Sequence, residues 1–316
     1  MLKLLLQLSF FSFVVLSCVT HNSKGPSDGD DFGYDDRSVT RATGIPSRSP
    51  HAMTGSAFIK KISYMTLKDR ETAIEREILS GNIPDFLRKL KPVRFSYTDK
   101  AGKLHKGTIF VMPDYLAIGS NDDFVRIPMT PITAQRIADR FGFIFPTTKM
   151  VDTIYNQAEV KLTPKPLPAG PKMVSSEYYK KHNEMIERQG APKGKLVSGH
   201  KKDIVVTNIL INRPYRVAIY GWHRGSGRPI QPLSTVHPNT YADYSHGVRL
   251  VSSTMIFDGK SVSLANIMHD ANTAQLVSRE GVIHNVRVKT SGWYVAGPVK
   301  TVKSSAKNRF ASAKRR

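Results

Sequence analysis

The sequence predicts an α+β fold, in which a small N-terminal domain of mixed helices and antiparallel strands precedes a β-rich C-terminal domain. Apolar residues recur with helical spacing in several windows of the first half and alternate with polar residues in much of the second half. A proline-rich segment at residues 161–174 separates the halves. With 316 residues, 40% of them hydrophobic, the chain is long enough for one large domain or two medium ones.

The N-terminus has the features of an export signal. Residues 1–3 carry a positive charge, residues 4–16 form an apolar run, and Ser17 then precedes Cys18, the single cysteine of the chain. The run is shorter than the roughly 20 residues that a membrane-spanning helix needs. We therefore expect residues 1–17 to be a signal peptide and no segment of the mature protein to cross a bilayer.

The end of this leader, Val15-Leu16-Ser17-Cys18, resembles the bacterial lipoprotein box. The resemblance implies cleavage before Cys18, a diacylglycerol on its thiol, and attachment to the membrane through that lipid. Val19 after the cysteine implies the periplasmic face of the outer membrane. With Cys18 acylated no thiol remains, so disulfides, thiolate zinc sites and cysteine nucleophiles are excluded.

Both ends of the mature chain are predicted to be disordered. Residues 18–57 hold the acylated cysteine and a tether rich in Ser, Gly, Asp and Pro, and residues 299–316 form a basic tail. The chain has 47 Lys and Arg against 25 Asp and Glu, a net charge of +22. This charge favours polyanionic partners, nucleic acid included, without choosing among them. Because the protein is expected to be exported, we expect no nucleic acid and name peptidoglycan or an anionic envelope polymer as the possible partner.

The first domain is predicted over residues 58–160. Its opening helix has Ile74, Ile78 and Leu79 on one face and ends at Gly81, and a later helix ends at Gly142. Alternating patterns and turn residues predict the strands between them. The predicted elements are a helix at 69–80, an amphipathic piece at 85–90, strands at 93–98, 104–112, 115–118 and 124–127, and helices at 133–141 and 149–158. The last two look like a helix-turn-helix, but the export signal argues against DNA binding.

The second domain is predicted over residues 175–298, after the linker at 161–174. Its alternation of apolar and polar residues is typical of strands with one wet face. The predicted elements are a helix at 175–188 and strands at 204–211, 216–222, 248–257, 262–267, 281–288 and 293–295. Residues 223–243 are expected to form a loop with little regular structure, and connections this long are often functional.

This loop and its borders carry the candidate catalytic residues. They supply imidazole, carboxylate, hydroxyl and guanidinium groups: His223, His237, Asp243, Ser245, His246 and Arg249. Because His223 ends one predicted strand while Asp243 and His246 begin the next, a single pocket can hold them. The alternative is that the aromatic residues here pack the domain and the histidines lie on its surface or in its core.

One resemblance suggests an envelope enzyme scaffold. Ser245-His246-Gly247-Val248-Arg249 resembles the catalytic loop of L,D-transpeptidases, which reads Ser-His-Gly-Cys-Arg. The predicted envelope location and the β-rich C-terminal half agree with that family. Valine stands where the family has its nucleophilic cysteine, so the resemblance implies a related scaffold without thiol catalysis.

A second resemblance suggests zinc. His237, Asp243 and His246 form a His-x5-Asp-x2-His pattern, similar to the first half of the ligand set in zinc peptidases of the D-alanyl-D-alanine dipeptidase type. The spacing differs by one residue, and the downstream His-x-His element of that family is missing. The resemblance implies a catalytic zinc with an open position for water, and a further ligand from His223, His269 or His284.

A third hypothesis needs no metal. Ser245 could attack a carbonyl, with its proton taken by His223 or His237, because adjacent residues on a strand point to opposite faces and His246 therefore cannot serve as its base. Arg249 lies on the same face as Ser245 and could hold a substrate carboxylate, as in peptidoglycan stem peptides.

The body of the chain resembles bacterial envelope lipoproteins of an uncharacterised family, chiefly over residues 114–130 and 241–251. Together with the candidate residues, this predicts a lipid-anchored envelope protein that hydrolyses peptide or amide bonds of the cell wall through a His/Asp site. The alternative is a non-enzymatic envelope protein that binds anionic polymers or a protein partner.

Overall fold

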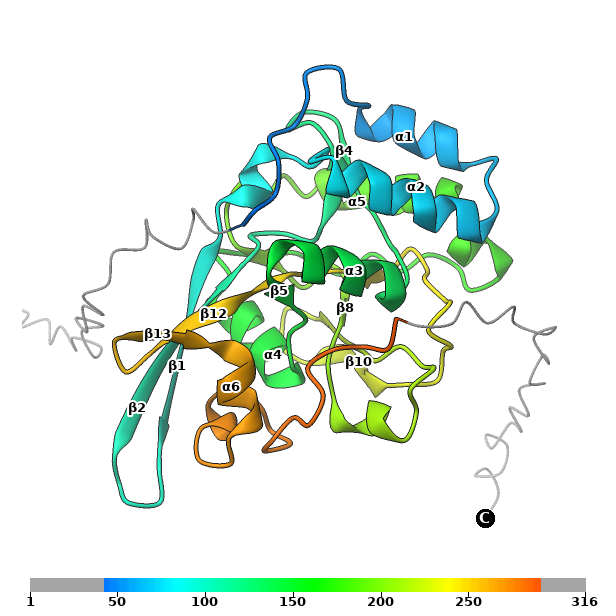
Figure 1. The fold of residues 1–316 in the computed structure, drawn as a ribbon. Coiled ribbons are helices and arrows are strands. Elements are labelled where there is room, and N and C mark those ends of the chain that lie inside the picture. Colours follow the sequence, from blue (N-terminus) through cyan, green and yellow to red (C-terminus); the bar gives the residue numbers. More distant parts are fainter. Residues whose placement is uncertain (1–42, 291–316) are drawn as a thin grey trace, which may run out of the picture. The chain divides into compact units, whose positions relative to one another are not determined.

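The computed structural model describes residues 43–290. They form the α+β fold that the sequence predicts, in which some helices gather at one end of the view and others lie among mainly antiparallel strands (Figure 1). The predicted signal peptide, Cys18, most of the tether, the predicted strand at 293–295 and the basic tail lie outside the described residues.

The predicted helices are confirmed to within a few residues, because their ends are encoded locally. Helix α3, for example, begins with Thr130, whose side chain accepts a hydrogen bond from the Thr133 amide, and ends at Gly142 with φ 73°. The α-helices of residues 43–290 are α1 (Gly55–Ile62), α2 (Leu67–Leu79), α3 (Pro131–Phe141), α4 (Thr148–Gln157), α5 (Ser176–Glu187) and α6 (Leu264–His269). Short 3-10 turns are η3 (Asp85–Arg88), η4 (Pro171–Val174), η5 (Asn208–Ile211) and η6 (Ala274–Leu276).

The strands form two larger sheets and two short ribbons. They are β1 (Lys91–Thr98), β2 (Leu104–Val111), β3 (Ala117–Gly119), β4 (Phe124–Arg126), β5 (Phe143–Ile144), β6 (Val160–Lys161), β7 (Val197–Ser198), β8 (Lys202–Ile204), β9 (Ile219–His223), β10 (Pro229–Ser234), β11 (His246–Gly247), β12 (Val251–Phe257) and β13 (Lys260–Ser263). The ribbons are β3–β4 and β6–β7.

The larger sheet crosses the predicted domain boundary. Its order is β1-β2-β12-β13, with β5 also paired to β12. Strand β12 lies antiparallel to β2, with Val251 opposite Val111 and Phe257 opposite Gly107. The segments expected on either side of residues 161–174 are therefore not separate in the fold, because they share one sheet. The local sequence could not reveal this pairing, which joins positions more than a hundred residues apart.

The second sheet positions the candidate site. Its order is β10-β9-β8-β11, and β11 pairs in parallel with β8, so that His246 lies opposite Lys202 and Gly247 opposite Asp203. A Cβ at Gly247 would lie 2.6 Å from a carbon of the Tyr115 ring. Only glycine allows this close approach, so Gly247 fixes the position of its neighbour His246.

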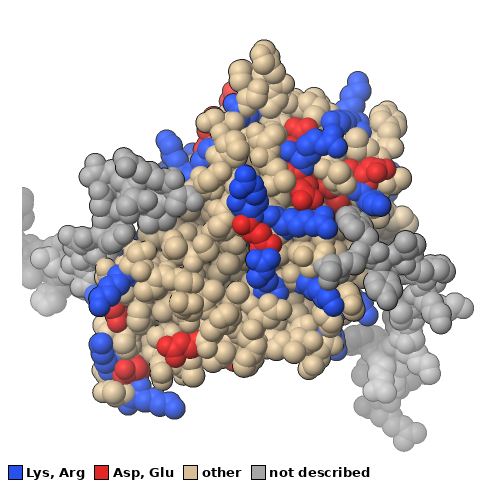
Figure 2. Space-filling model, in the orientation of Figure 1, with Lys and Arg blue, Asp and Glu red and all other residues tan. Residues whose placement is uncertain are grey.

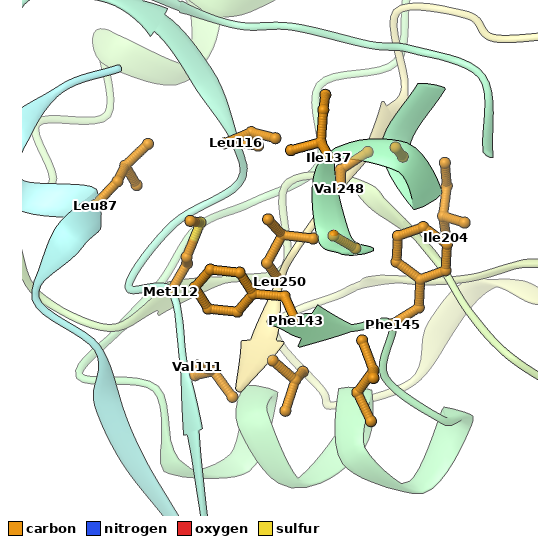
Figure 3. Close-up of a cluster of buried hydrophobic side chains, with 14 of the residues drawn as sticks. Leu87, Val111, Met112, Leu116, Ile137, Phe143, Phe145, Ile204, Val248 and Leu250 are labelled. Atoms are coloured by element: carbon orange, nitrogen blue, oxygen red, sulfur yellow. The ribbon is translucent and has the colours of Figure 1, made fainter. Parts of the chain in front are cut away.

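The core also draws on both halves of the chain. Figure 3 shows Val111 and Met112 packed with Phe143, Phe145, Val248 and Leu250, and all of these side chains belong to one buried cluster. Burial of such large apolar side chains is the main stabilising contribution to a fold of this size. The cluster leads directly into the β11 region, so the candidate site is supported by rigid packing.

Several predicted elements need correction. Residues 204–211 contain the end of β8 and the turn η5, where the Thr207 side chain accepts from the Ile209 amide, instead of one strand. Residues 223–243, expected as a loop, include β10, which forms a hairpin with β9. Residues 262–267 divide between β13 and α6, and α1 begins inside the predicted tether.

The predicted strand at 281–288 is also wrong. Residues 281–288 have no strand partner within the described part of the chain, although Ile283 and Val286 are buried. The Ile283 amide instead donates to the Met268 carbonyl at 2.9 Å. The alternating pattern therefore reflects two separate contacts with the core and no sheet.

Candidate functional site

Four of the six candidate residues lie together in the segment that leads into β11. Asp243, Ser245 and His246 are buried, with at most 1% of the surface of each residue exposed to solvent, and His237 is half-buried beside them. The aromatic ring of Tyr241 joins the group: it stacks on His237 at 4.2 Å between ring centroids and meets His246 edge-on at 5.7 Å. The sequence therefore identified the core of this cluster correctly as a spatial group.

Asp243 organises the buried part of the cluster. Its Oδ1 accepts hydrogen bonds from the Ser245 amide at 2.8 Å and the Ser245 hydroxyl at 2.6 Å, and its Oδ2 accepts from the Tyr241 hydroxyl at 3.0 Å. Burial raises the pKa of Asp243, but the charge that His246 carries when it is protonated and the Ser245 hydrogen bonds outweigh it and hold this pKa below its ordinary value. Asp243 is therefore a carboxylate at neutral pH.

This geometry corrects the hypothesis of a Ser245 nucleophile. The Ser245 hydroxyl donates to Asp243, whereas the hypothesis requires it to donate to the imidazole of His223 or His237. Two residues of separation favour this local carboxylate–hydroxyl bond, which is common where Asp begins a turn. Ser245 serves here to fix the Asp243 carboxylate.

His246 is an imidazole with unused hydrogen-bonding capacity. Its Nε2 lies 3.9 Å from Asp243 Oδ2, and neither ring nitrogen has a hydrogen-bond partner among the described residues. Burial lowers the pKa of His246 to about 4, against the opposing attraction of Asp243. The ring is therefore neutral at pH 7, and a buried polar group without partners usually marks a functional site or a bound water.

The outer edge of the cluster is formed by His237, Tyr241 and Lys202, each partly exposed. The rings of His237 and His246 have centroids 6.3 Å apart. Burial lowers the pKa of His237, while Asp243 raises it by a smaller amount. A neutral, solvent-reachable imidazole thus stands in front of a buried carboxylate and a second neutral imidazole.

Strain in the backbone marks the same edge. Trp222 has φ 58°, which is rare for a bulky residue and costs of the order of 1–3 kcal/mol. Its amide donates to the Lys201 carbonyl at 3.0 Å, and the Lys202 ammonium lies 5.1 Å from its ring centroid. Lys202 is a site residue that sequence analysis missed; only its pairing with His246 in the sheet reveals it.

His223 belongs to a different cluster. Its Nε2 lies 2.7 Å from Asp152 Oδ1 on α4, and its ring stacks on Tyr155 at 4.4 Å between centroids. Asp152 also accepts hydrogen bonds from Tyr220 and Arg279. The expectation that His223 shares the pocket of His246 is therefore not met, because α4 supplies it with another carboxylate.

Arg249 does not reach a substrate. It is 1% exposed, and its guanidinium donates to the Met112 carbonyl at 2.8 Å and to the Val197 carbonyl at 2.6 Å. The same group lies 4.4 Å from the centroid of the Tyr115 ring. The predicted substrate-binding role is wrong, since Arg249 ties three separate segments together in the interior.

A zinc centre is not supported either. Within residues 43–290 no three His, Cys, Asp or Glu side chains come together as a metal-binding group, and this includes His237, Asp243 and His246. Both Asp243 oxygens already accept hydrogen bonds from Ser245 and Tyr241. The sequence spacing resembles a ligand set, but the three side chains do not form a metal-binding group in the described part of the chain.

A buried polar network behind the site was not predicted. The Tyr115 hydroxyl donates to Asp203 at 2.8 Å, and the Lys201 ammonium donates to the Tyr244 carbonyl at 2.5 Å. Burial raises the pKa of Asp203 to about 6 and lowers that of Lys201 to about 7. In the sequence, His200-Lys201-Lys202-Asp203 looks like an exposed charged run, so no signal identified it as interior.

Comparison of the chain with family models, curated proteins and solved structures finds no match in any of the three. Within residues 43–290 no helix has the length and apolar character needed to cross a membrane.

Proposed function

We propose that this protein is a lipid-anchored hydrolase of the cell envelope that cleaves peptide or amide bonds of the cell wall, with His237 as the base that activates water. One observation carries the proposal. A half-exposed neutral imidazole lies in front of the buried Asp243 carboxylate and the imidazole of His246, which has no hydrogen-bond partner among residues 43–290. Clusters of perturbed titratable groups of this kind are typical of acid–base sites.

The cluster suggests a simple sequence of proton transfers. Neutral His237 takes a proton from a water molecule as that water attacks the carbonyl carbon of the substrate amide. The buried Asp243 carboxylate stabilises the resulting imidazolium by its charge, and neutral His246 adds no competing positive charge. The imidazolium then returns the proton to the leaving amine as the carbon–nitrogen bond breaks.

Cell-wall digestion tests this activity. The full lipidated chain in detergent micelles is incubated with purified peptidoglycan, and released fragments are identified by mass spectrometry. The wild type should release fragments with new amino and carboxyl ends, whereas His237→Gln should be at least about 100-fold slower, as expected for loss of a general base. His51→Gln, at an exposed histidine outside the cluster, is the matched control.

The envelope location rests on Cys18 and is tested separately. Cys18→Ala should move the protein from the membrane fraction to the soluble fraction, and mass spectrometry of the wild type should find an acylated cysteine at the mature N-terminus. Recovery of unprocessed chain in the cytosol would contradict the proposed location.

A second function is favoured by the charge. The net charge is +22, and Figure 2 shows Lys and Arg side chains spread over the visible face among fewer Asp and Glu. A non-enzymatic protein that binds anionic polymers through this surface would tolerate His237→Gln and His246→Gln. Its binding would instead weaken steeply as salt is added.

A further inference from the structure

An open groove borders the candidate site. It has a volume of about 830 Å³ and lies between the chain that follows η5 and the chain that follows β10. Its described lining is Asn212, Arg213, Pro214, Tyr215, Arg216, Thr235, Val236 and Pro238. Both walls come from short loops that are held by the second sheet.

The groove is fastened directly to His237. The Val217 amide donates to the His237 carbonyl at 3.1 Å, and the Asn239 amide donates to the Tyr215 carbonyl at 2.9 Å. Arg216 and Pro238 also pair as an isolated antiparallel bridge. The groove therefore adjoins the segment that carries His237, and the charge of its lining residue Arg216 is close enough to lower the pKa of the His237 imidazole.

The groove carries two arginines that are not paired with a carboxylate within residues 43–290. Arg213 donates to the Thr235 hydroxyl at 3.0 Å and Arg216 to the Val236 carbonyl at 2.8 Å, and both of these acceptors are uncharged. None of the described lining residues is acidic. Each guanidinium has five N–H donors, so most of them remain for a ligand.

The rest of the lining is apolar or aromatic. Val236 is 64% exposed and Tyr215 is 43% exposed, and Pro214 and Pro238 lie beside them. The Lys289 ammonium lies 4.9 Å from the centroid of the Tyr215 ring and adds a further positive charge. A ligand that fits has carboxylates for the arginine forks and an apolar or ring-shaped part for the tyrosine.

We propose that this groove binds a carboxylate-bearing wall peptide and presents its amide bond to His237. The proposal rests on the proposed function for the choice of wall peptide, and it deepens that function by naming the substrate class. Arg213 and Arg216 hold carboxylates of the peptide, and Tyr215 packs against its backbone or side chains. A phosphate-rich polymer would meet the same charges but would not need the guanidinium forks to lie beside an acid–base site.

Binding of a soluble probe tests the groove. The probe is the disaccharide tetrapeptide of peptidoglycan, titrated calorimetrically into the full lipidated chain in detergent micelles. The double variant Arg213→Gln/Arg216→Gln should weaken binding at least about tenfold, since hydrogen bonds to charged groups are lost. Arg213→Lys/Arg216→Lys should also weaken it, because lysine keeps the charge and loses the fork.

Controls separate the groove from general electrostatics. Lys68→Gln/Arg76→Gln removes the same charge from exposed positions on α2 and should leave the dissociation constant within about twofold. The probe with amidated carboxylates should bind as weakly as the double variant binds the natural probe. Equal weakening by both charge-removing variants, or preference for a phosphate-rich polymer over the tetrapeptide, would overturn the proposal.

The same titrations distinguish this proposal from the hydrolase proposal. His237→Gln should bind the probe as the wild type does while losing turnover. Arginine-dependent binding without any turnover by the wild type would leave the groove standing and remove the hydrolase. Turnover by the wild type, together with probe binding that does not change when Arg213 and Arg216 are replaced, would support the hydrolase proposal and contradict the groove proposal.

Discussion

His246 and Arg249 lie three positions apart and are equally buried, yet they differ in how many hydrogen bonds their side chains make. Two Arg249 nitrogens donate to backbone carbonyls, so this side chain cross-links the interior. The His246 nitrogens have no partner among the described residues. A buried residue whose hydrogen bonds are used has a structural role, and one whose hydrogen bonds are unused is free to take part in chemistry.

Arg249→Ala should lower the free energy of unfolding by about 3–5 kcal/mol. It leaves two carbonyls without donors and Asp203, whose Oδ1 lies 3.9 Å from Arg249 Nε, without its nearest positive charge. Urea unfolding at pH 7 measures this loss. Arg213→Ala, at an exposed position, is the control and should change stability by less than about 0.5 kcal/mol.

His246 should make the protein acid-sensitive. Its pKa is 6.5 in the unfolded reference and about 4 when buried, so the unfolded chain binds more protons between these values and stability falls as pH drops from 6.5 to 4. His246→Gln should reduce this acid-induced loss by up to about 3 kcal/mol, compared between pH 7 and pH 4. An acid-induced loss equal to that of the wild type, with His51→Gln as control, would show that His246 is protonated in the native state.

At the scale of elements, the helices were predictable because capping and stop residues are local. Gly142 ends a helix in the prediction as it does in the structure, and Thr66 and Thr130 cap the helix starts within a few residues of the predicted positions. The strand predictions were wrong where apolar and polar residues alternate in the sequence but the segment pairs with no other strand in the described part of the chain. The buried Ile283 and Val286 mimic a strand, although each simply packs against the core.

The β1–β2 hairpin has an element-scale property of its own. His105 stacks between Tyr97 and Phe257 at 5.3 and 5.4 Å, and its ring nitrogens lie 3.2 Å from Asp99 and 2.7 Å from Asp258. This arrangement fastens the hairpin to the β12–β13 turn.

Protonation of His105 should strengthen its interactions with Asp99 and Asp258 and so stabilise the contact between the hairpin and the β12–β13 turn. Hydrogen bonds to Asp258 and then Asp99 raise the pKa of His105 above 6.5, so its stabilising contribution is complete below pH 6.5 and is lost as pH rises through the raised value. An NMR titration should find the His105 pKa above 6.5 in the wild type and lower in Asp258→Asn. A wild-type value at or below 6.5 would contradict the contacts.

At the scale of the whole molecule, the pairing of strands that are distant in the chain is what the local sequence could not predict. Strand β12 joins β2, and β11 joins β8 in parallel, so Lys202 comes beside His246 and Arg249 becomes interior. The cluster of His237, Asp243 and His246 was predictable because its members are close in the chain. The separation of His223 was not, because it depends on Asp152 of α4.

The shared sheet predicts one cooperative unit. A fragment of residues 43–165 lacks β12 and leaves the β2 edge unpaired, so it should not fold, whereas the longer chain should unfold in a single transition over residues 43–290. Circular dichroism and amide NMR dispersion of the fragment measure this. A dispersed amide spectrum from the fragment alone would restore the division at residues 161–174.

The pH dependence of kcat/KM on the soluble disaccharide tetrapeptide tests the central claim most directly. With His237 as the base, the wild type should show an ascending limb with an apparent pKa below 6.5, and Asp243→Asn should move that limb to lower pH because a negative charge that raises the His237 pKa is removed. A limb that stays in place in Asp243→Asn, or activity that survives His237→Gln, would contradict the account.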